Sequence, residues 1–249
     1  MNSFVVPRLL AGMSQREVAA IAGVSSSTVA RIENGTLEPS VARMERLFAA
    51  VGYAFPTPQP SYDRSALAAF RGLLDPSPGL ADFEGASEWV QRWKRAKLIN
   101  AEGEMRDMRR LAVVAAAQVR LVARPGIVTG WSSISSAEVA TRLCSAGINA
   151  AASGVAGAQR VTRVGSDVWQ IVYVEDVEAA IDATQLGASG IGLPMSLIPF
   201  DNVTSIGCVR DADGAGWVDP LQVLLDCYAG NDRMPDQADL LADALLLAA

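Results

Sequence analysis

The sequence predicts two folded parts: an all-α domain at the N-terminus and an α+β domain with a mixed sheet at the C-terminus. Apolar residues recur at helical spacing through residues 15–51, with turn-forming residues between them. A proline-rich stretch at 55–60 cannot continue a helix and favours an extended spacer. After residue 118, β-rich segments alternate with helical ones. We therefore expect an N-terminal domain at 1–56, a linker at 57–63, a helical connector at 64–117 and the α+β domain at 118–249.

Residues 15–34 predict two short helices joined by a tight turn. Ser14 is the expected N-cap of the first helix, and Glu17 would complete a capping box with it. Gly23 stands where this helix must end, at a position that favours a positive φ. Ser25 is the expected cap of a second helix that runs to about Asn34.

The two helices have different expected faces. Val18, Ala22 and the preceding Leu10 should share one buried face, and Val29 with Ile32 should bury the second helix. The second helix would expose a largely hydroxyl-bearing set: Ser26, Ser27, Thr28, Ala30 and Arg31. At a helix N-terminus, hydroxyls and backbone N–H groups can reach phosphates and base edges, which favours docking in a DNA major groove.

The stretch MSQREVAAIAGVSSSTVARIENGTLEPSVARMERLFAAVGY resembles the Cro/C1-type (XRE) helix-turn-helix domain. The matching features are Ser14-Gln15, Ala19 with Gly23, the run VSSSTVARIENG, and a helix start at Pro39-Ser40. The resemblance covers about residues 4–56 and implies a lambda repressor-like domain of five helices that binds double-stranded DNA. The alternative is a piece of an ordinary helical bundle. The expected DNA-contacting residues are Gln15, Arg16, Ser25, Ser26, Ser27, Thr28, Arg31, Asn34 and Arg43; for Arg43, a solvated surface arginine is an equal alternative.

The helix that starts at Pro39-Ser40 should end at Gly52. Its apolar positions follow helical spacing and are Val41, Met44, Leu47, Phe48 and Val51.

Charge is unevenly distributed along the 249 residues, whose net charge is −6. Residues 1–56 carry +1, residues 57–125 carry +3, and the remainder carries −10. A domain of +1 neutralises few phosphates, so a monomer should bind DNA weakly at cellular salt. We therefore expect a homodimer that reads a palindromic operator.

Composition excludes several function classes. No apolar run of 18 residues exists, so we expect no membrane span, and the N-terminus lacks a secretory signal. The absence of histidine, with three distant cysteines, argues against the usual zinc sites and histidine-based catalysis. We expect Cys144, Cys208 and Cys227 to be buried, and the protein to be cytoplasmic.

The connector predicts helices at 64–74, 86–99 and 102–117. A basic cluster on the second of these could contact DNA, although a solvated helix face is the favoured interpretation. The cluster comprises Arg92, Lys94, Arg95 and Lys97.

The α+β domain predicts a strand at 168–174, where β-branched and aromatic residues follow one another without a break. Asp219-Pro220 should open a helix with proline at its first position. The other expected β-rich segments are 119–123, 127–129, 194–199 and 203–209, with a turn at 211–216. The other expected helices are 137–146, 177–186, 221–228 and 236–247, with a helix or turn at 153–159.

A second resemblance covers about residues 105–249. The strand 169–174, the SLIPFDN turn and the segment WVDPLQVLLDCYAGNDRMPDQADLLADALL resemble the C-terminal half of AbiEi-family antitoxins, and TGWSSISSAEVATRLCSAGINAAASGVAGAQRV resembles their earlier portion. The resemblance implies the antitoxin of a type IV toxin–antitoxin system, which represses its own promoter and opposes a nucleotidyltransferase toxin. Those proteins usually carry a winged helix-turn-helix, so the head of this chain departs from the pattern. Gln222 and Asp226, four apart, would form an antitoxin surface or, as the alternative, a buried hydrogen-bond network.

Three motifs resemble catalytic or metal sites only superficially. Gly165-Ser166-Asp167 lacks the paired carboxylates that a two-metal nucleotidyltransferase site needs. The Asp211-to-Gly216 turn is too short for a calcium loop, and the glycine-rich residues 187–192 follow a helix instead of a strand. We therefore expect no enzyme, no metal and no cofactor.

The sequence thus predicts a sequence-specific DNA-binding repressor, specifically an antitoxin that regulates its own operon. A phage-type immunity repressor is one alternative. In another, the C-terminal domain acts as a protein-binding module or enzyme, and the helix-turn-helix is a targeting element. Expected partners are operator DNA, a second copy of the chain and a nucleotidyltransferase toxin.

Overall fold

A computed structural model describes residues 4–55, 59–75, 77, 79–165, 169–184, 186–187, 190, 192–230 and 233–248. The chain divides into two compact units, Met1–Ala123 and Arg124–Ala249. The first unit carries fifteen basic and twelve acidic residues, a net charge of +3, whereas the second carries six and fifteen, a net charge of −9. None of the helices in the described part of the chain is both long and apolar enough to cross a membrane.

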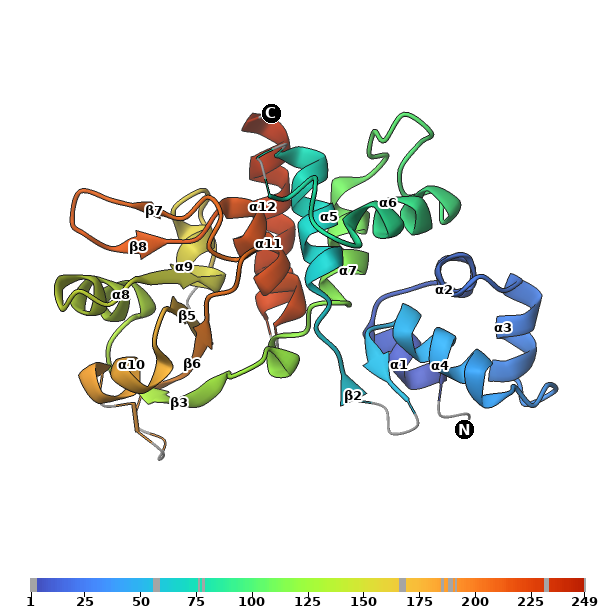
Figure 1. Ribbon diagram of the computed structural model, residues 1–249, viewed down its shortest axis with the longest axis horizontal. Helices are drawn as coiled ribbons and strands as arrows, with labels where there is room; N and C mark the ends of the chain where they lie inside the picture. The colour runs from blue at the N-terminus through green and yellow to red at the C-terminus, as the bar shows by residue number, and fades with distance from the viewer. Residues whose placement is uncertain are drawn as a thin grey trace. The chain divides into compact units, whose positions relative to one another are not determined.

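The first unit begins with four helices, drawn in blue in Figure 1. They are α1 (Val5–Leu10), α2 (Gln15–Ala22), α3 (Ser26–Glu33) and α4 (Val41–Ala50). Strand β1 (Tyr53–Ala54) follows and pairs antiparallel with β2 (Gln59–Pro60). The predicted helix–turn–helix arrangement is confirmed, but the described residues 4–55 hold four helices where five were expected. The next helix, α5, begins only at Arg64.

The predicted capping chemistry of α2 and α3 is confirmed. Ser14 and Glu17 form a reciprocal capping box, and Gly23 adopts the left-handed conformation with φ 68°. The Ser25 hydroxyl accepts a hydrogen bond from the Thr28 N–H. One expectation is wrong: Leu10, the last residue of α1, is 64% exposed and does not share a buried face with Val18.

The connector forms helices α5 (Arg64–Leu74), α6 (Ala86–Arg95) and α7 (Met108–Ala116), followed by the 3-10 turn η1 (Leu121–Ala123). Helix α5 has the predicted bounds. Helix α6 ends earlier than predicted, at Arg95. Lys97, just beyond it, adopts a φ of 60°, and a right-handed helix cannot continue through a residue with positive φ. Helix α7 begins later than predicted because the Asp107 carboxylate accepts from the Arg110 N–H and so caps the helix there.

The connector packs directly on the four-helix head. The buried Gln118 Nε2 donates to the Ala50 carbonyl over 2.9 Å. Gly52 has φ +78°, and a Cβ there would overlap the carbonyl oxygen of Ala117. Only glycine therefore permits the close approach of the chain after α4 to the end of α7. Head and connector belong to one compact unit.

The second unit contains a six-stranded mixed sheet, as predicted, in the order β3-β6-β5-β4-β8-β7. Pairs β5–β6 and β4–β8 are parallel, and the other neighbouring pairs are antiparallel. The strands are β3 (Val128–Ser132), β4 (Ala150–Ser153), β5 (Gln170–Val174), β6 (Leu193–Pro199), β7 (Val209–Arg210) and β8 (Gly216–Trp217).

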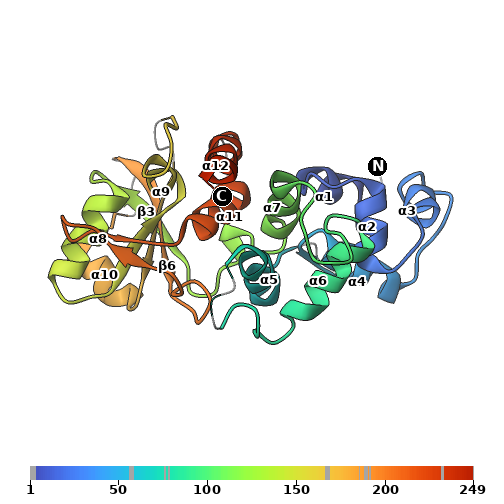
Figure 2. The same cartoon turned by 90° about the horizontal axis from the view of Figure 1, so that it is seen from above.

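Helices cover both faces of this sheet, as Figure 2 shows. Helices α8 (Ser136–Ser145) and α10 (Val177–Thr184) pack on one face over a core that includes Val172 and Leu197. Helices α9 (Gly154–Gln159), α11 (Pro220–Ala229) and α12 (Met234–Ala248) pack together on the other face. Burial on both faces explains why β5 reads as an unbroken apolar run.

The strand predicted at 203–209 is wrong. The Asp201 carboxylate accepts hydrogen bonds from the N–H groups of Val203 (2.9 Å) and Thr204 (2.8 Å), so the chain turns where a strand was expected. Only Val209 of that segment lies in a strand. The β-rich segment predicted at 119–123 is also not a strand, since it holds one isolated bridge at Val119 and then η1.

Other expectations are met in part. Cys227 is buried as predicted, whereas Cys144 and Cys208 are half-buried. Ser166, Asp167 and the first residue of the strand predicted at 168–174 lie outside the described residues.

Candidate nucleic-acid interface

The N-terminus of α3 presents a cluster of hydroxyl groups. Ser25 Oγ accepts from Thr28 N at 3.1 Å and lies 2.9 Å from Ser27 Oγ and 2.7 Å from Thr28 Oγ1. We call these three residues the Ser25 hydroxyl cluster. The first backbone N–H groups of α3, at Ser26 and Ser27, have no partner within the helix, and the helix dipole is positive there. The arrangement suits an anion such as a backbone phosphate.

The C-terminal end of α3 presents Arg31 and Asn34, which are both exposed. The Arg31 carbonyl is used by the next turn, because it accepts from Thr36 N (2.8 Å) and Thr36 Oγ1 (3.1 Å). Among the described residues, the Arg31 guanidinium forms no hydrogen bond and no ion pair. It is therefore available to a base edge or a phosphate.

The N-terminus of α2 presents Gln15 and Arg16, which the structure treats differently. Arg16 is exposed, whereas Gln15 is half-buried and its Nε2 donates to Glu33 Oε2 over 2.7 Å. The Gln15 amide thus already ties the start of α2 to the end of α3. Arg43, the third residue of α4, is half-buried.

The Glu33 side chain links α3 to α1 and α2. Arg8 binds it through two hydrogen bonds, Nε to Oε1 at 2.5 Å and Nη2 to Oε2 at 2.9 Å, and also donates to the Met13 carbonyl. Burial alone would raise the pKa of Glu33, but the hydrogen bonds from Arg8 and Gln15 and the charge of Arg8 outweigh burial and lower it. Glu33 is therefore an ionised carboxylate whose hydrogen bonds connect α1, α2 and α3.

A second ion pair joins the head to the connector. Arg110 of α7 donates to both carboxylate oxygens of Glu17 and to the Gly12 carbonyl. Burial would raise the pKa of Glu17, but Arg110 and Ser14 together lower it. The carboxylate that caps α2 is thus also held by a residue 93 positions later in the chain.

Sequence reasoning missed both Arg8–Glu33 and Arg110–Glu17. Glu17 was recognised only as a local capping residue, and Arg8 was given no role. The partners are 25 and 93 residues apart, so no local pattern indicates the pairing.

A family comparison identifies this region. Residues 8–56 match the helix-turn-helix family model. We refer to residues 8–56 as the HTH domain. The chain matches no curated protein and no solved structure in the same comparisons. The resemblance of residues 105–249 to AbiEi-family antitoxins gains no support from them.

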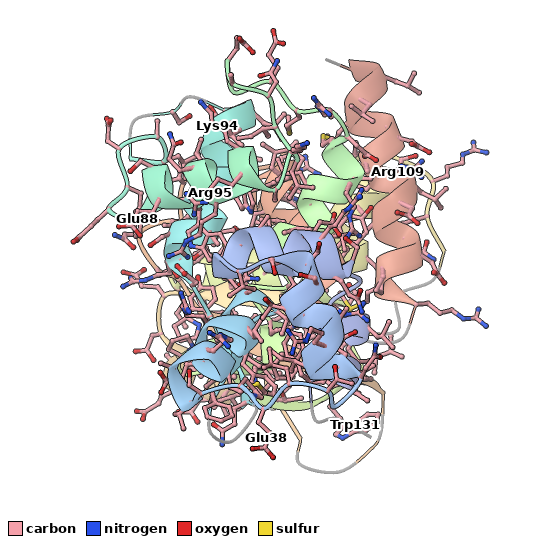
Figure 3. All side chains as sticks on the ribbon, turned by 90° about the vertical axis from the view of Figure 1, so that its right-hand side faces the viewer. Glu38, Glu88, Lys94, Arg95, Arg109 and Trp131 are labelled. Atoms are coloured by element: carbon pink, nitrogen blue, oxygen red, sulfur yellow. The ribbon has the colours of Figure 1, made fainter. Side chains whose placement is uncertain are left out.

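The basic cluster on α6 lies in the same unit as the HTH domain, and α6 packs beside α2. Figure 3 labels Lys94 and Arg95 there. Lys94 Nζ donates to the Ala101 carbonyl at 2.6 Å, and Arg92 lies over the Trp89 ring. Arg95 and Lys97 are exposed. Half of the cluster is therefore occupied by local contacts, as expected of a solvated helix face.

Gln222 and Asp226 do not form a surface, because both are fully buried. Asp226 Oδ1 accepts from Arg124 Nη2 (2.8 Å), Tyr173 Oη (3.0 Å) and Gln222 Nε2 (2.9 Å), and its Oδ2 accepts from Ser153 Oγ (2.6 Å). Burial raises the pKa of Asp226, against the opposing effect of these donors. The antitoxin-surface interpretation is thus wrong for this pair, and the alternative, a buried hydrogen-bond network, is what the structure contains.

In the described part of the chain, no three His, Cys, Asp or Glu side chains lie close enough together to hold a metal ion. The turn at Asp211 is organised internally, since Asp211 Oδ2 accepts from Trp217 Nε1 at 2.6 Å.

Proposed function

We propose that the protein is a sequence-specific transcription regulator that binds double-stranded DNA through its HTH domain and represses its target promoter. The observation that carries the proposal is the exposed face of α3, where the Ser25 hydroxyl cluster lies at the N-terminal, positive end of the helix dipole and Arg31 follows one turn after Ser27. The hydrogen bonds from Arg8 and Gln15 to Glu33 hold α3 in place, so this face is preorganised for docking.

The charge of the chain supports a dimeric reader. The HTH-containing unit has a net charge of +3, and its arginines include three, Arg8, Arg92 and Arg110, that form salt bridges with glutamates. Few charges remain to neutralise phosphates, so one copy should bind weakly at cellular salt. Two copies on a palindromic operator would double the contacts, with half-sites about 34 Å apart. A cytoplasmic location is part of the same proposal, which assigns no catalytic step to the protein.

The direct test is a mobility-shift titration with the DNA upstream of the protein's own gene. Replacing Ser27 and Arg31 together by alanine should weaken binding by at least about tenfold, because one good base contact contributes about 1–3 kcal/mol. Arg46→Ala is the matched control, since Arg46 is an exposed arginine of α4 outside the proposed interface. Unchanged binding by the double variant, or an equal loss in Arg46→Ala, would remove α3 as the reading helix.

We further propose that the regulated operon is a toxin–antitoxin operon and that the protein is its antitoxin. The support is the resemblance of residues 105–249 stated above, whose signature segment includes α11 with its buried Gln222 and Asp226. An adjacent nucleotidyltransferase gene that arrests growth alone and is tolerated on co-expression with this protein is the expected result. Neighbouring lysogeny genes, with no toxin activity, would favour an immunity repressor instead.

A further inference from the structure

A pocket of about 430 Å³ opens at one end of the sheet in the second unit. Strands β3 and β4 end there, and β5 and β6 begin there. The N-terminus of α8 and the last turn of α9 border the opening, and β8 lies beside α8 (Figure 1). A concave site with a few converging polar groups is a common place for a small ligand.

One polar atom in the pocket wall is left without a protein partner. Gln170, the first residue of β5, is 2% exposed and lines the pocket. Its Nε2 donates to the Ile134 carbonyl at 3.1 Å, which fixes the orientation of the amide. Its Oε1 accepts from no donor among the described residues. A buried acceptor without a donor costs free energy, so a ligand N–H or O–H at this point would be stabilising.

The pocket also carries one cationic side chain, which can pair with one negative charge. Arg160, at the end of α9, lines it and lies 4.8 Å from the centre of the Trp217 ring. Arg160 forms no salt bridge within the described residues. The hydrogen bonds from Trp217 Nε1 and two backbone N–H groups, together with the charge of Arg160, lower the pKa of the neighbouring Asp211, whose carboxylate is screened by water. The N-terminus of α8, capped by Ser135, adds the positive end of a ten-residue helix.

The remaining wall is mostly apolar, with Ile134, Leu193 and Trp217 as its larger side chains. A single arginine with an apolar wall matches a monoanion that has an apolar body better than a phosphate dianion, which usually recruits more than one cation.

We propose that this pocket binds a small organic carboxylate that has an apolar body and one N–H or O–H donor. The carboxylate pairs with Arg160 at the N-terminus of α8, the donor meets Gln170 Oε1, and the apolar body packs on Ile134 and Leu193. The site lies in the second unit and shares no residue with the HTH domain.

The test titrates the intact protein with N-acetyl-L-leucine, which carries all three features, and follows the Trp217 indole N–H by NMR. Binding should be saturable with a Kd on the order of 1 mM, as expected for a ligand of this size. Two matched probes each lack one feature: 4-methylpentanoate has no N–H donor, and N-acetyl-L-leucinamide has no carboxylate. Each should bind about tenfold more weakly or worse.

Variants provide a second test. Arg160→Gln should weaken N-acetyl-L-leucine binding about tenfold, whereas Arg163→Gln, an exposed arginine outside this pocket, should leave it unchanged. No saturable Trp217 shift up to about 20 mM would overturn the proposal, because it would place the affinity well below that expected. Equal binding of the three probes, or an equal loss in both arginine variants, would overturn it as well. The probe comparison uses the unaltered chain, so it holds even if a variant folds poorly.

Discussion

Arg8 and Glu33 are joined by two hydrogen bonds, of 2.5 and 2.9 Å, across 25 residues of the HTH domain. Their side chains are only 12% and 5% exposed, so the pair is largely withdrawn from water. Since Gln15 binds the same carboxylate, this pair connects the helix that would read DNA to the two helices that precede it. The Glu33 carboxylate therefore links α3 to α1 and α2, in addition to the packing of the buried Val29 and Ile32.

Removing the arginine should loosen the HTH domain. Arg8→Ala leaves Glu33 charged, enclosed and short of its main donor, and we expect a loss of about 2–4 kcal/mol in the stability of the domain. Hydrogen exchange of the α2 and α3 amides measures this locally. Arg46→Ala, at an exposed position, should change the opening free energy measured by exchange by less than about 0.5 kcal/mol. If the two variants behave alike, the pair does not hold α3.

Acid should weaken the same domain. Glu33 and Glu17 both have a pKa lowered below the ordinary 4.5 in the folded chain. Each therefore contributes stability that is complete above pH 4.5 and is lost as the pH falls through the folded pKa. We expect the urea concentration at the unfolding midpoint, followed at the α3 amides between about pH 7 and pH 3, to decrease once the pH is lowered below 4.5. Arg8→Met should reduce the effect, and a midpoint that rises on acidification would contradict the assignment.

Two serine caps in the HTH domain should differ in their contribution. Ser25 caps α3 through its hydroxyl, whereas Ser40 precedes α4 without a side-chain cap hydrogen bond. We expect Ser25→Ala to cost about 1 kcal/mol and Ser40→Ala only a few tenths, as read from thermal unfolding of the two variants. Equal losses in the two variants would contradict a stabilising contribution from the Ser25 cap hydrogen bond.

Two ion pairs in the second unit offer a similar contrast. Asp226→Ala leaves Arg124 buried without its carboxylate, and we expect a loss of about 3–5 kcal/mol. Glu138→Ala breaks the exposed pair with Arg142 and should cost less than about 0.5 kcal/mol. Urea unfolding followed at the β5 amides measures both. A small effect of Asp226→Ala would mean that the buried network is dispensable.

Salt dependence separates the HTH domain from the basic cluster on α6. If Arg16 contacts a phosphate, Arg16→Ala should reduce the slope of log K against log salt by about 1. Arg95→Ala should leave the slope unchanged, since α6 is interpreted as a solvated face. The reverse outcome would place the phosphate contacts on α6.

Local chemistry allowed the sequence to predict the two helices and the turn of the HTH domain. The capping box at Ser14 and the left-handed Gly23 depend on residues at most a few positions apart, so a linear pattern contains them. The strand at β5 was equally legible, because a sheet covered on both faces requires a continuous apolar run. The segment at 203–209 shows the limit: its β-branched residues favour a strand, but the Asp201 carboxylate captures the backbone N–H groups first.

Contacts between distant residues could not be predicted. The spacing of Gln222 and Asp226 indicated that they interact, but their burial depends on Arg124, which is 102 residues from Asp226. The same holds for Arg110, whose role at the head of the chain follows only from the packing of α7. The environment of Gln170 likewise depends on a distant segment, since its amide N–H donates to the Ile134 carbonyl 36 residues earlier in the chain.

The central claim is that α3 of the HTH domain is the surface that meets DNA. It is tested most directly by mapping backbone amide shifts of the intact protein as its own upstream DNA is added. We predict the largest shifts in residues 15–34, centred on the Ser25 hydroxyl cluster and Arg31, with those shifts lost in the Ser27→Ala, Arg31→Ala double variant. Shifts concentrated on α6 or within residues 124–249, with α3 unchanged, would contradict the account.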